Sequence, residues 1–357
     1  MKTHAAIALS PDAELEIRQV DLAEPGPGEV RVKMQACGIC RSDLSALEGK
    51  ETVEFPVVLG HEGAGVVEAV GSAVTSVKEG ERIVLSWTPA CGLCPGCLRG
   101  EVHLCEQVNM TAGSTGPLTM NGQGLDRFMA LGAFCEHVVV PEAMAIPVQS
   151  ELDAAHTCLI GCGVTTGFGA AVNTAAIRWG ESVTVFGCGG VGLAAIQGAR
   201  VAGAAQIIAI DPIAERREAA LRVGATAALD PAGAVKQILQ DTQGGTDVAI
   251  ECVGTTATMA DAFNVVRWGG RSIVVGLPAY TDMVEIPALM LLREKSIKGS
   301  IYGSANPRVD FQKIASLGDQ GTLNFGPLVD KTRHFSQINE GFAEMREGTL
   351  TRVVLTF

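Results

Sequence analysis

The sequence predicts an α/β protein with two domains, and three observations support this class. The chain has 357 residues, a length that suits two domains better than a single core. Roughly the first 160 residues read as short β-rich segments interrupted by glycine and proline. From about residue 164, short apolar strands alternate with helices, which is typical of a parallel sheet with helices on both faces.

The β-rich part contains three segments with clear strand character. Residues 15–17 and 30–34 alternate between apolar and polar side chains, and residues 63–71 read as another strand with glycine at both ends. We expect a first domain over residues 1–163.

The second part has the more regular pattern. Its expected strands are residues 182–186, 206–210, 247–250 and 272–275, and its expected helices are residues 191–202 and 214–223. This repeating order predicts a doubly wound parallel sheet over residues 164–303. Beyond it, residues 304–357 should hold one more strand, ending the chain in residues 351–357, together with helices that return to the first domain.

Composition excludes several classes of protein. Hydrophobic residues make up 47% and charged residues 18%, which indicates a folded globular chain. The net charge of −12 disfavours a nucleic-acid partner. No apolar run reaches the ~18 residues that a membrane span needs, and the first residues lack the features of a secretory signal. We therefore expect a cytoplasmic protein with no membrane partner.

Four of the 11 cysteines form the sharpest metal signal. Cys91, Cys94, Cys97 and Cys105 lie close together in one polar loop that also contains several glycines. Four thiolates at this spacing suit a closed tetrahedral zinc site, whose role would be structural. The alternatives are four unrelated buried cysteines or the ligands of an iron–sulfur cluster, but the segment is dense and polar and nothing else indicates electron transfer.

A glycine-rich turn supplies the second signal. Residues 187–192 match the pattern G-x-G-x-x-G, follow a predicted strand and open a predicted helix. In that context the glycines allow a pyrophosphate to approach the amide N–H groups at the start of the helix. Asp211 ends the next predicted strand, where a carboxylate binds ribose hydroxyls and repels a 2′-phosphate, so NAD is favoured over NADP. The alternative is a merely flexible glycine turn.

A third, dispersed signal consists of Cys40, His61 with Glu62, and Cys162, each close to glycine in the chain. Two thiolates and one imidazole would make a zinc site with an open fourth position. The residues alone do not establish that these three segments converge, because a single histidine in such a turn is more often exposed or a hydrogen-bond partner than a ligand.

These motifs, in this order, resemble the zinc-containing medium-chain alcohol dehydrogenases, and the resemblance extends over the whole chain. It implies a GroES-like β-rich catalytic domain that holds both zinc sites, with a Rossmann domain inserted into it. It also implies that Cys40, His61 and Cys162 are the catalytic zinc ligands, that Glu62 is a carboxylate able to ligate the metal transiently, and that Asp43 orients His61.

The same resemblance implies further roles. Ser42 would take the substrate proton, and Trp87 would line the substrate channel. Much of the family has a histidine where this chain has Ser45, so the proton relay must end differently here. Arg41 and Arg352 would contact the pyrophosphate, Thr166 the nicotinamide side and Arg216 the adenosine. The predicted cofactor-binding residues are Arg41, Thr166, Gly187, Gly189, Gly190, Val191, Gly192, Asp211, Arg216, Val275 and Arg352.

The sequence thus predicts an enzyme that transfers a hydride between an alcohol and NAD, with two zinc ions per chain. An alternative is a thiol-dependent formaldehyde dehydrogenase acting on an S-hydroxymethyl adduct, since residues 131–134 and 161–167 look similar to that branch. A rival of another class is a catalytically silent protein that binds NAD or stores zinc, which the intact Ser42 and zinc-ligand set disfavours. The long segment between Cys105 and Phe134 resembles that of dimeric members, so we expect a homodimer, with a tetramer as the alternative.

Overall fold

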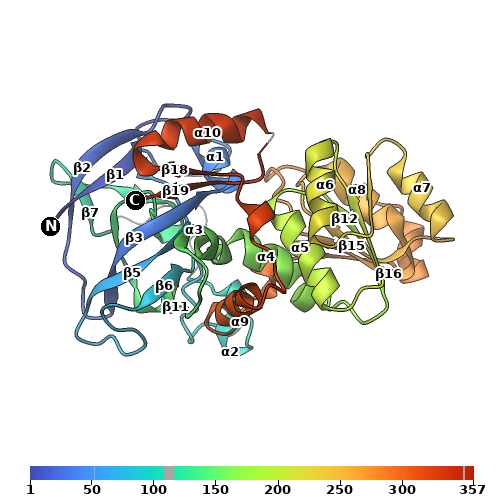
Figure 1. The fold of residues 1–357 in the computed structure, drawn as a ribbon, viewed down its shortest axis with the longest axis horizontal. Helices are drawn as coiled ribbons and strands as arrows, with labels where there is room; N and C mark the ends of the chain where they lie inside the picture. The colour runs from blue at the N-terminus through green and yellow to red at the C-terminus, as the bar shows by residue number, and fades with distance from the viewer. Residues whose placement is uncertain (52, 108–115, 349) are drawn as a thin grey trace. The chain divides into compact units, whose positions relative to one another are not determined.

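The computed structural model describes residues 1–51, 53–107, 116–348 and 350–357. The chain divides into two compact units (Figure 1). The first unit comprises Met1–Cys162, Asn306–Gly321 and Val329–Phe357, and the second comprises Gly163–Ala305 and Thr322–Leu328. Residues 322–328, which the sequence places in the returning segment, therefore group with the second unit.

Two sheets build the first unit. One has the strand order β11 (Ala145–Pro147), β6 (Arg82–Leu85), β5 (Glu62–Val70), β3 (Glu29–Ile39), β19 (Val353–Thr356) and β18 (Lys331–His334), with β10 (His137–Pro141) also paired to β3. The other has the order β8 (Gln123–Gly124), β7 (Leu118–Met120), β2 (Glu16–Leu22), β1 (Lys2–Ala8), β4 (Val57–Val58) and β9 (Asp126–Arg127).

Strand β3 is the centre of the first unit, because it pairs with β5, β10 and β19. Its antiparallel register with β5 sets Gly38 opposite Glu62, and its register with β19 sets Ile39 opposite Val353. This pairing brings the segment after β3 next to the start of β5. Helix α1 (Arg41–Leu47) follows β3 directly, and α10 (Ile338–Glu347) packs against both α1 and β19 (Figure 1).

The C-terminal region contains a strand that the sequence does not predict. β18 pairs in parallel with β19, but its residues are Lys331, Thr332, Arg333 and His334, and they are mostly exposed. A polar edge strand has no apolar face to bury, so it produces no hydrophobic alternation. The other helices of the first unit are α2 (Pro95–Leu98), α3 (Ala154–Thr157) and α9 (Pro307–Asp319).

The second unit is a doubly wound parallel sheet, which confirms the predicted fold class. Its strand order is β14 (Ala227–Leu229), β13 (Gln206–Ile210), β12 (Ser182–Phe186), β15 (Thr246–Glu251), β16 (Val266–Val274) and β17 (Ser296–Gly299), with every pair parallel. The order reverses direction between β12 and β15, which is where ligands bind in such sheets. The predicted strands 182–186 and 206–210 and the predicted helix 214–223, which is α6 (Ala214–Val223), are confirmed residue for residue.

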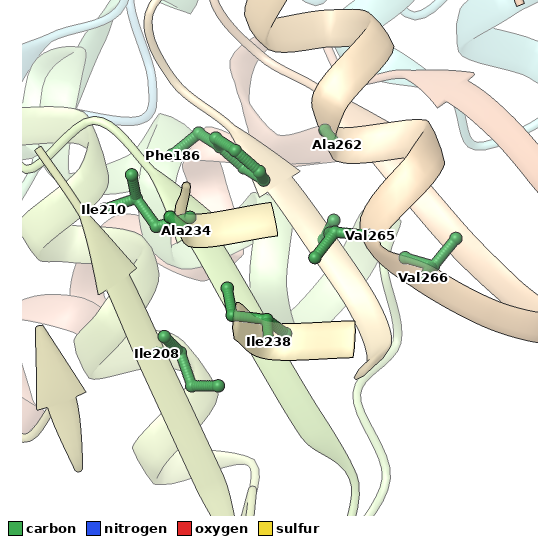
Figure 2. Packing of buried hydrophobic residues seen from close by; sticks show 9 residues of the cluster. Phe186, Ile208, Ile210, Ala234, Ile238, Ala262, Val265 and Val266 are labelled. Atoms are coloured by element: carbon green, nitrogen blue, oxygen red, sulfur yellow. The ribbon is translucent and has the colours of Figure 1, made fainter. Parts of the chain in front are cut away.

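Helices cover this sheet. α7 (Ala234–Asp241) and α8 (Thr256–Val265) bury Ala234, Ile238 and Ala262 against β12, β13 and β15, forming one apolar cluster (Figure 2). α5 (Gly190–Val201) packs on the same three strands and lies outside that cluster. α4 (Gly163–Gly169) packs in turn on α5.

Within the described part of the chain, no single helix has the length and apolar character needed to cross a membrane. The pair Ala154–Gly161 and Gly163–Thr174 passes that test only when joined across a 55° bend, and most of these residues are buried in the protein.

The apolar cluster gives a direct test of the packing. Ile238 is 1% exposed, so Ile238→Ala should lower the free energy of unfolding of the second unit by about 2–5 kcal/mol in a denaturant titration of the apoprotein. Leu221→Ala in α6 is the control, because that side chain is 48% exposed and its loss should cost less than about 1 kcal/mol. Equal losses in both variants would contradict the packing in Figure 2.

Candidate metal centres and cofactor site

A buried carboxylate organises the first donor cluster. Asp43, in the first turn of α1, is fully buried, and its Oδ2 accepts a hydrogen bond of 2.9 Å from the backbone N–H of Cys40. Its Oδ1 accepts from the backbone N–H of Gly60 at 2.9 Å and lies 3.1 Å from His61 Nδ1. Asp43 therefore ties the segment that carries Cys40 to the segment that carries His61.

That contact fixes the role of each His61 nitrogen. A carboxylate only accepts, so Nδ1 donates to Asp43 and the lone pair remains on Nε2. Nε2 is buried and has no hydrogen-bond partner among the described residues. A buried polar atom without a partner is costly, and a metal ion would satisfy it.

The donors that could share such an ion are present. One ligand atom each from Cys40, His61, Glu62 and Cys162 lies within 4.8 Å of the others. Cys40 follows β3, Glu62 begins β5, and Cys162 precedes α4. The structure therefore brings together the dispersed residues whose convergence the sequence alone leaves open. Two sulfur donors, one imidazole and a carboxylate suit zinc with an exchangeable position.

The two thiols of this cluster differ in acidity. A hydrogen bond from the Cys162 thiol lowers the pKa of Cys40 well below its usual value, and the positive charge of Arg352 lowers it further. The same hydrogen bond raises the pKa of Cys162. The pair thus shares one proton, which a zinc ion would displace when it binds both sulfurs.

Glu62 lies fully buried beside these donors. Burial raises the pKa of Glu62 to about 7, although Arg352 acts in the opposite direction with its Nη2 at 3.4 Å from Glu62 Oε1. A Cβ atom on Gly38 would lie 2.3 Å from Glu62 Oε2, so glycine at this position of β3 makes room for the carboxylate. Arg352 also donates to the carbonyl of Ile39 at 3.0 Å, and its guanidinium is almost fully buried within this cluster.

The remaining predicted residues of the first unit lie around the same helix and loops. Ser42 is half-buried, with its Oγ 3.9 Å from Cys40 Sγ, and Ser45 is half-buried one turn further along α1. Arg41 is exposed at the start of α1, and Trp87 is buried in the segment after β6.

One neighbour of the cluster escapes prediction from sequence. The ring of Phe128 packs edge-on against His61, with ring centroids 5.6 Å apart and an interplanar angle of 77°. Phe128 lies in a short 3₁₀ helix, Phe128–Ala130, far from His61 along the chain. A single apolar residue in a loop carries no signal of such a contact.

The four clustered cysteines form the second donor set. The ligand atoms of Cys91, Cys94, Cys97 and Cys105 lie within 4.8 Å of one another. Backbone N–H groups of Cys97 and Glu106 donate to Cys94 Sγ at 3.5 and 3.4 Å and lower the pKa of that thiol to about 6. Four sulfurs with supporting N–H donors leave no open position, which suits structural zinc.

The glycine-rich turn of the second unit has the form of an anion site. Gly187 follows β12 with φ +85°, and a Cβ atom on Gly192 would lie 1.8 Å from the Gly187 carbonyl oxygen. Gly189 caps α5 without a side-chain hydrogen bond, and a Cβ atom there would meet nothing within 4 Å. The first amides of α5, at Gly190, Val191 and Gly192, are therefore available to a pyrophosphate.

Asp211 lies against this turn. It is buried, its Oδ2 accepts from the backbone N–H of Cys188 at 2.8 Å, and its Oδ1 accepts from that of Ile213 at 2.9 Å. Each oxygen keeps a lone pair for a ribose hydroxyl. Arg217 donates to the Asp211 backbone carbonyl at 2.6 Å. Arg216, which the sequence places near the adenosine, is half-buried in α6.

The last two predicted cofactor residues also lie in the second unit. Thr166 is half-buried in α4, and Val275 is half-buried just after β16, with its N–H donating to the Glu251 carbonyl at 2.8 Å.

The chain is similar to known proteins along its whole length. Residues 26–150 match the alcohol dehydrogenase GroES-like domain, and residues 190–319 match the zinc-binding dehydrogenase domain. A Mycobacterium tuberculosis protein provisionally named alcohol dehydrogenase D is 38% identical over 366 residues, covering 99% of this chain and 100% of the relative. S-(hydroxymethyl)glutathione dehydrogenase of Escherichia coli is 38% identical over 369 residues, covering 100% of both chains.

Solved structures show the same similarity. Benzyl alcohol dehydrogenase from Acinetobacter calcoaceticus matches with a TM-score of 0.95 at 29% identity, covering 100% of this chain and 99% of that one. An alcohol dehydrogenase zinc-binding domain protein from Burkholderia ambifaria matches with a TM-score of 0.96 at 33% identity, with the same coverage.

The two donor sets predict the metal content. Elemental analysis of unchelated protein should find two zinc ions per chain, because the sets are separate and each is complete. Cys162→Ser and Cys97→Ser should each remove one zinc ion from a different set. Cys135→Ala is the control, since Cys135 is buried outside both sets and its loss should leave both ions bound. Finding one zinc ion or none in the wild-type protein would contradict the assignment.

Proposed function

The chain belongs to the zinc-containing medium-chain dehydrogenase family, and from this premise we propose that it is a zinc-dependent, NAD-linked alcohol dehydrogenase. The substrate would be a small alcohol or its carbonyl partner, interconverted by reversible hydride transfer. The observation that carries the proposal is the donor set of Cys40, His61, Glu62 and Cys162, with the buried and unpartnered Nε2 of His61.

The donor set determines what chemistry is available. When bound, zinc would act as a Lewis acid toward the substrate oxygen, and the nicotinamide would accept or donate the hydride. Asp43 holds His61 in the tautomer that presents Nε2 to the metal. Phe128 packs against the His61 ring, and Glu62 and Arg352 are buried in the same cluster.

Ser42 supplies the first hydroxyl of the proposed proton path. Its Oγ lies 3.9 Å from Cys40 Sγ, which places it beside the donor set. It would accept the substrate proton at Oγ and pass its own proton on. Ser45 cannot act as the base that a histidine would be, and the path beyond Ser42 would then continue through water.

The choice of NAD over NADP rests on Asp211. Its carboxylate is held rigidly by two backbone N–H groups beside the glycine-rich turn. A 2′-phosphate would bring nearly two negative charges against it. Arg217 is engaged by the Asp211 carbonyl and by Asp230, which leaves it poorly placed to compensate.

A second candidate function has one observation in its favour, the 38% identity with S-(hydroxymethyl)glutathione dehydrogenase of Escherichia coli. One assay separates the two candidates: NADH formation by zinc-loaded protein with a panel of alcohols, and with formaldehyde in the presence and absence of a low-molecular-weight thiol. Turnover of simple alcohols supports the first proposal, and formaldehyde turnover that requires the thiol supports the second. Absence of both would contradict each.

We also propose a homodimer. The proposal rests on the long segment between Cys105 and Phe134, which resembles that of dimeric members of the family. Residues 108–115 of this segment lie outside the described residues.

The proposed proton path predicts unequal effects of two serines. Ser42→Ala should lower kcat for alcohol oxidation by about a hundredfold or more, the scale of a general acid–base contribution. Ser45→Ala is the matched control on the same helix and should lower it much less. Steady-state rates across pH give both numbers, and equal losses would place Ser45 in the path.

Removal of the Asp211 carboxylate should shift the cofactor preference from NAD toward NADP. The wild-type enzyme should prefer NAD over NADP by about a hundredfold or more in kcat/KM, because NADP meets repulsion and loses two hydrogen bonds. Asp211→Gly should weaken NAD use and raise NADP use. Asp241→Asn, which removes one exposed charge at the end of α7, should leave the ratio nearly unchanged. Comparable use of both cofactors by the wild type would show that Asp211 does not select.

A further inference from the structure

Glu251 is a buried carboxylate that the proposed mechanism does not use. It is the last residue of β15, fully buried, and paired with Phe186 of β12 on one side and Val274 of β16 on the other. It therefore stands at the carboxyl edge of the sheet, beside the point where the strand order reverses.

Its side chain holds the loop that follows β15. Glu251 Oε1 accepts from the backbone N–H groups of Val253 and Gly254, both at 2.8 Å, and from the Thr258 hydroxyl at 2.7 Å. Three donors meet at this one oxygen, so loop 252–254 is held at Val253 and Gly254 and tied to the first turn of α8.

Its backbone holds the loop that follows β16. The Glu251 carbonyl accepts from the N–H groups of Val275 at 2.8 Å and Gly276 at 3.0 Å. The two loops are also in direct backbone contact, since a Cβ atom on Gly276 would lie 2.1 Å from Gly254 N and 2.8 Å from Glu251 Oε2. Glu251 thus bonds to both loops at a place where there is no room for a side chain between them.

The same assembly reaches the glycine-rich turn. A Cβ atom on Gly187 would lie 2.8 Å from Val253 Cγ2, so the Val253 side chain packs on the first glycine of that turn. Three strand ends therefore meet around Glu251: the turn after β12, the loop 252–254 and the loop 275–277. The last of these begins at Val275, one of the predicted cofactor-binding residues.

A simpler role for Glu251 is to stabilise α8. A carboxylate near a helix N-terminus is favourable, and the Thr258 contact lies in the first turn of α8. That role does not explain the two N–H bonds that the side chain accepts within loop 252–254.

We propose that Glu251 is a positioning residue for the dinucleotide: its side chain fixes loop 252–254 between loop 275–277 and the glycine-rich turn, in the arrangement that receives the cofactor. The inference rests on the proposed function in one respect, that a nicotinamide dinucleotide binds at this edge of the sheet.

The test uses the zinc-loaded, full-length protein and NADH as the probe. Glu251→Asp withdraws the carboxylate from Val253 and Gly254 and should raise the Kd for NADH about tenfold or more, as expected for the loss of hydrogen bonds to a charged acceptor. Glu251→Gln keeps the shape and loses the charge, so it should raise Kd about threefold. Hydrogen exchange at Val253 and Gly254 should accelerate in both variants before NADH is added, whereas Val275 and Gly276 bond to the backbone carbonyl of residue 251 and should keep their protection.

Thr255→Ala is the matched control. Thr255 caps α8 by accepting from the Thr258 N–H, so its loss should lower Tm without changing the Kd for NADH more than about twofold. Glu251 variants that lower Tm as Thr255→Ala does, yet bind NADH like the wild type, would overturn the proposal. If Glu251→Asp does not fold, Glu251→Gln carries the same comparison.

The outcome also distinguishes this proposal from the proposed function. A wild-type protein that binds no NADH would overturn the function. The exchange measurement needs no cofactor, and unchanged protection of Val253 and Gly254 in the Glu251 variants would overturn the positioning role by itself.

Discussion

The first unit depends on a single buried carboxylate. Asp43 accepts from the N–H of Cys40, the N–H of Gly60 and Nδ1 of His61, and so joins the start of α1 to the segment before β5. A buried carboxylate is costly unless its oxygens are hydrogen-bonded, and these three donors meet that requirement. The result is that a candidate metal ligand is positioned and its tautomer is set without a metal ion. Without that bond, Nε2 of His61 would have no fixed direction.

Charge balance explains the rest of the cluster. Asp43, Glu62 and the Cys40–Cys162 pair bring negative charge into a buried volume, and Arg352 is the fixed cation that faces them, with its pKa raised further by Glu62 and Cys40 despite burial. A divalent ion held by the proposed donor set would add the remaining positive charge. The second unit has a similar arrangement. Asp211 accepts from backbone N–H groups of the glycine-rich turn and of the segment after β13, as Asp43 accepts from those of Cys40 and Gly60. In both units buried carboxylates position the backbone that carries the ligand-binding groups.

The parts predictable from sequence are those whose signal is local. The strands 182–186 and 206–210 are confirmed because each is a short apolar run with clear ends, and the cysteine cluster is visible because its members are close in the chain. The site around His61 is different, since it depends on the register that sets Gly38 opposite Glu62, which no local pattern encodes, and only the family resemblance indicates it. Phe128, β18 and Glu251 are invisible for the same reason: their roles arise from tertiary contacts.

The most direct test of this account measures how tightly each zinc ion is held when Asp43 is altered. In Asp43→Asn an amide NH₂ replaces one acceptor oxygen, so the bonds to Cys40 and His61 cannot all be kept. Competition with a chromogenic chelator should then show one zinc ion bound about 10–100-fold more weakly, the usual effect of losing a carboxylate partner of a ligating histidine. The zinc ion of the four-cysteine set should be unaffected. Two zinc ions that both retain wild-type affinity would show that Asp43 does not set the geometry of the site, and the account would be wrong.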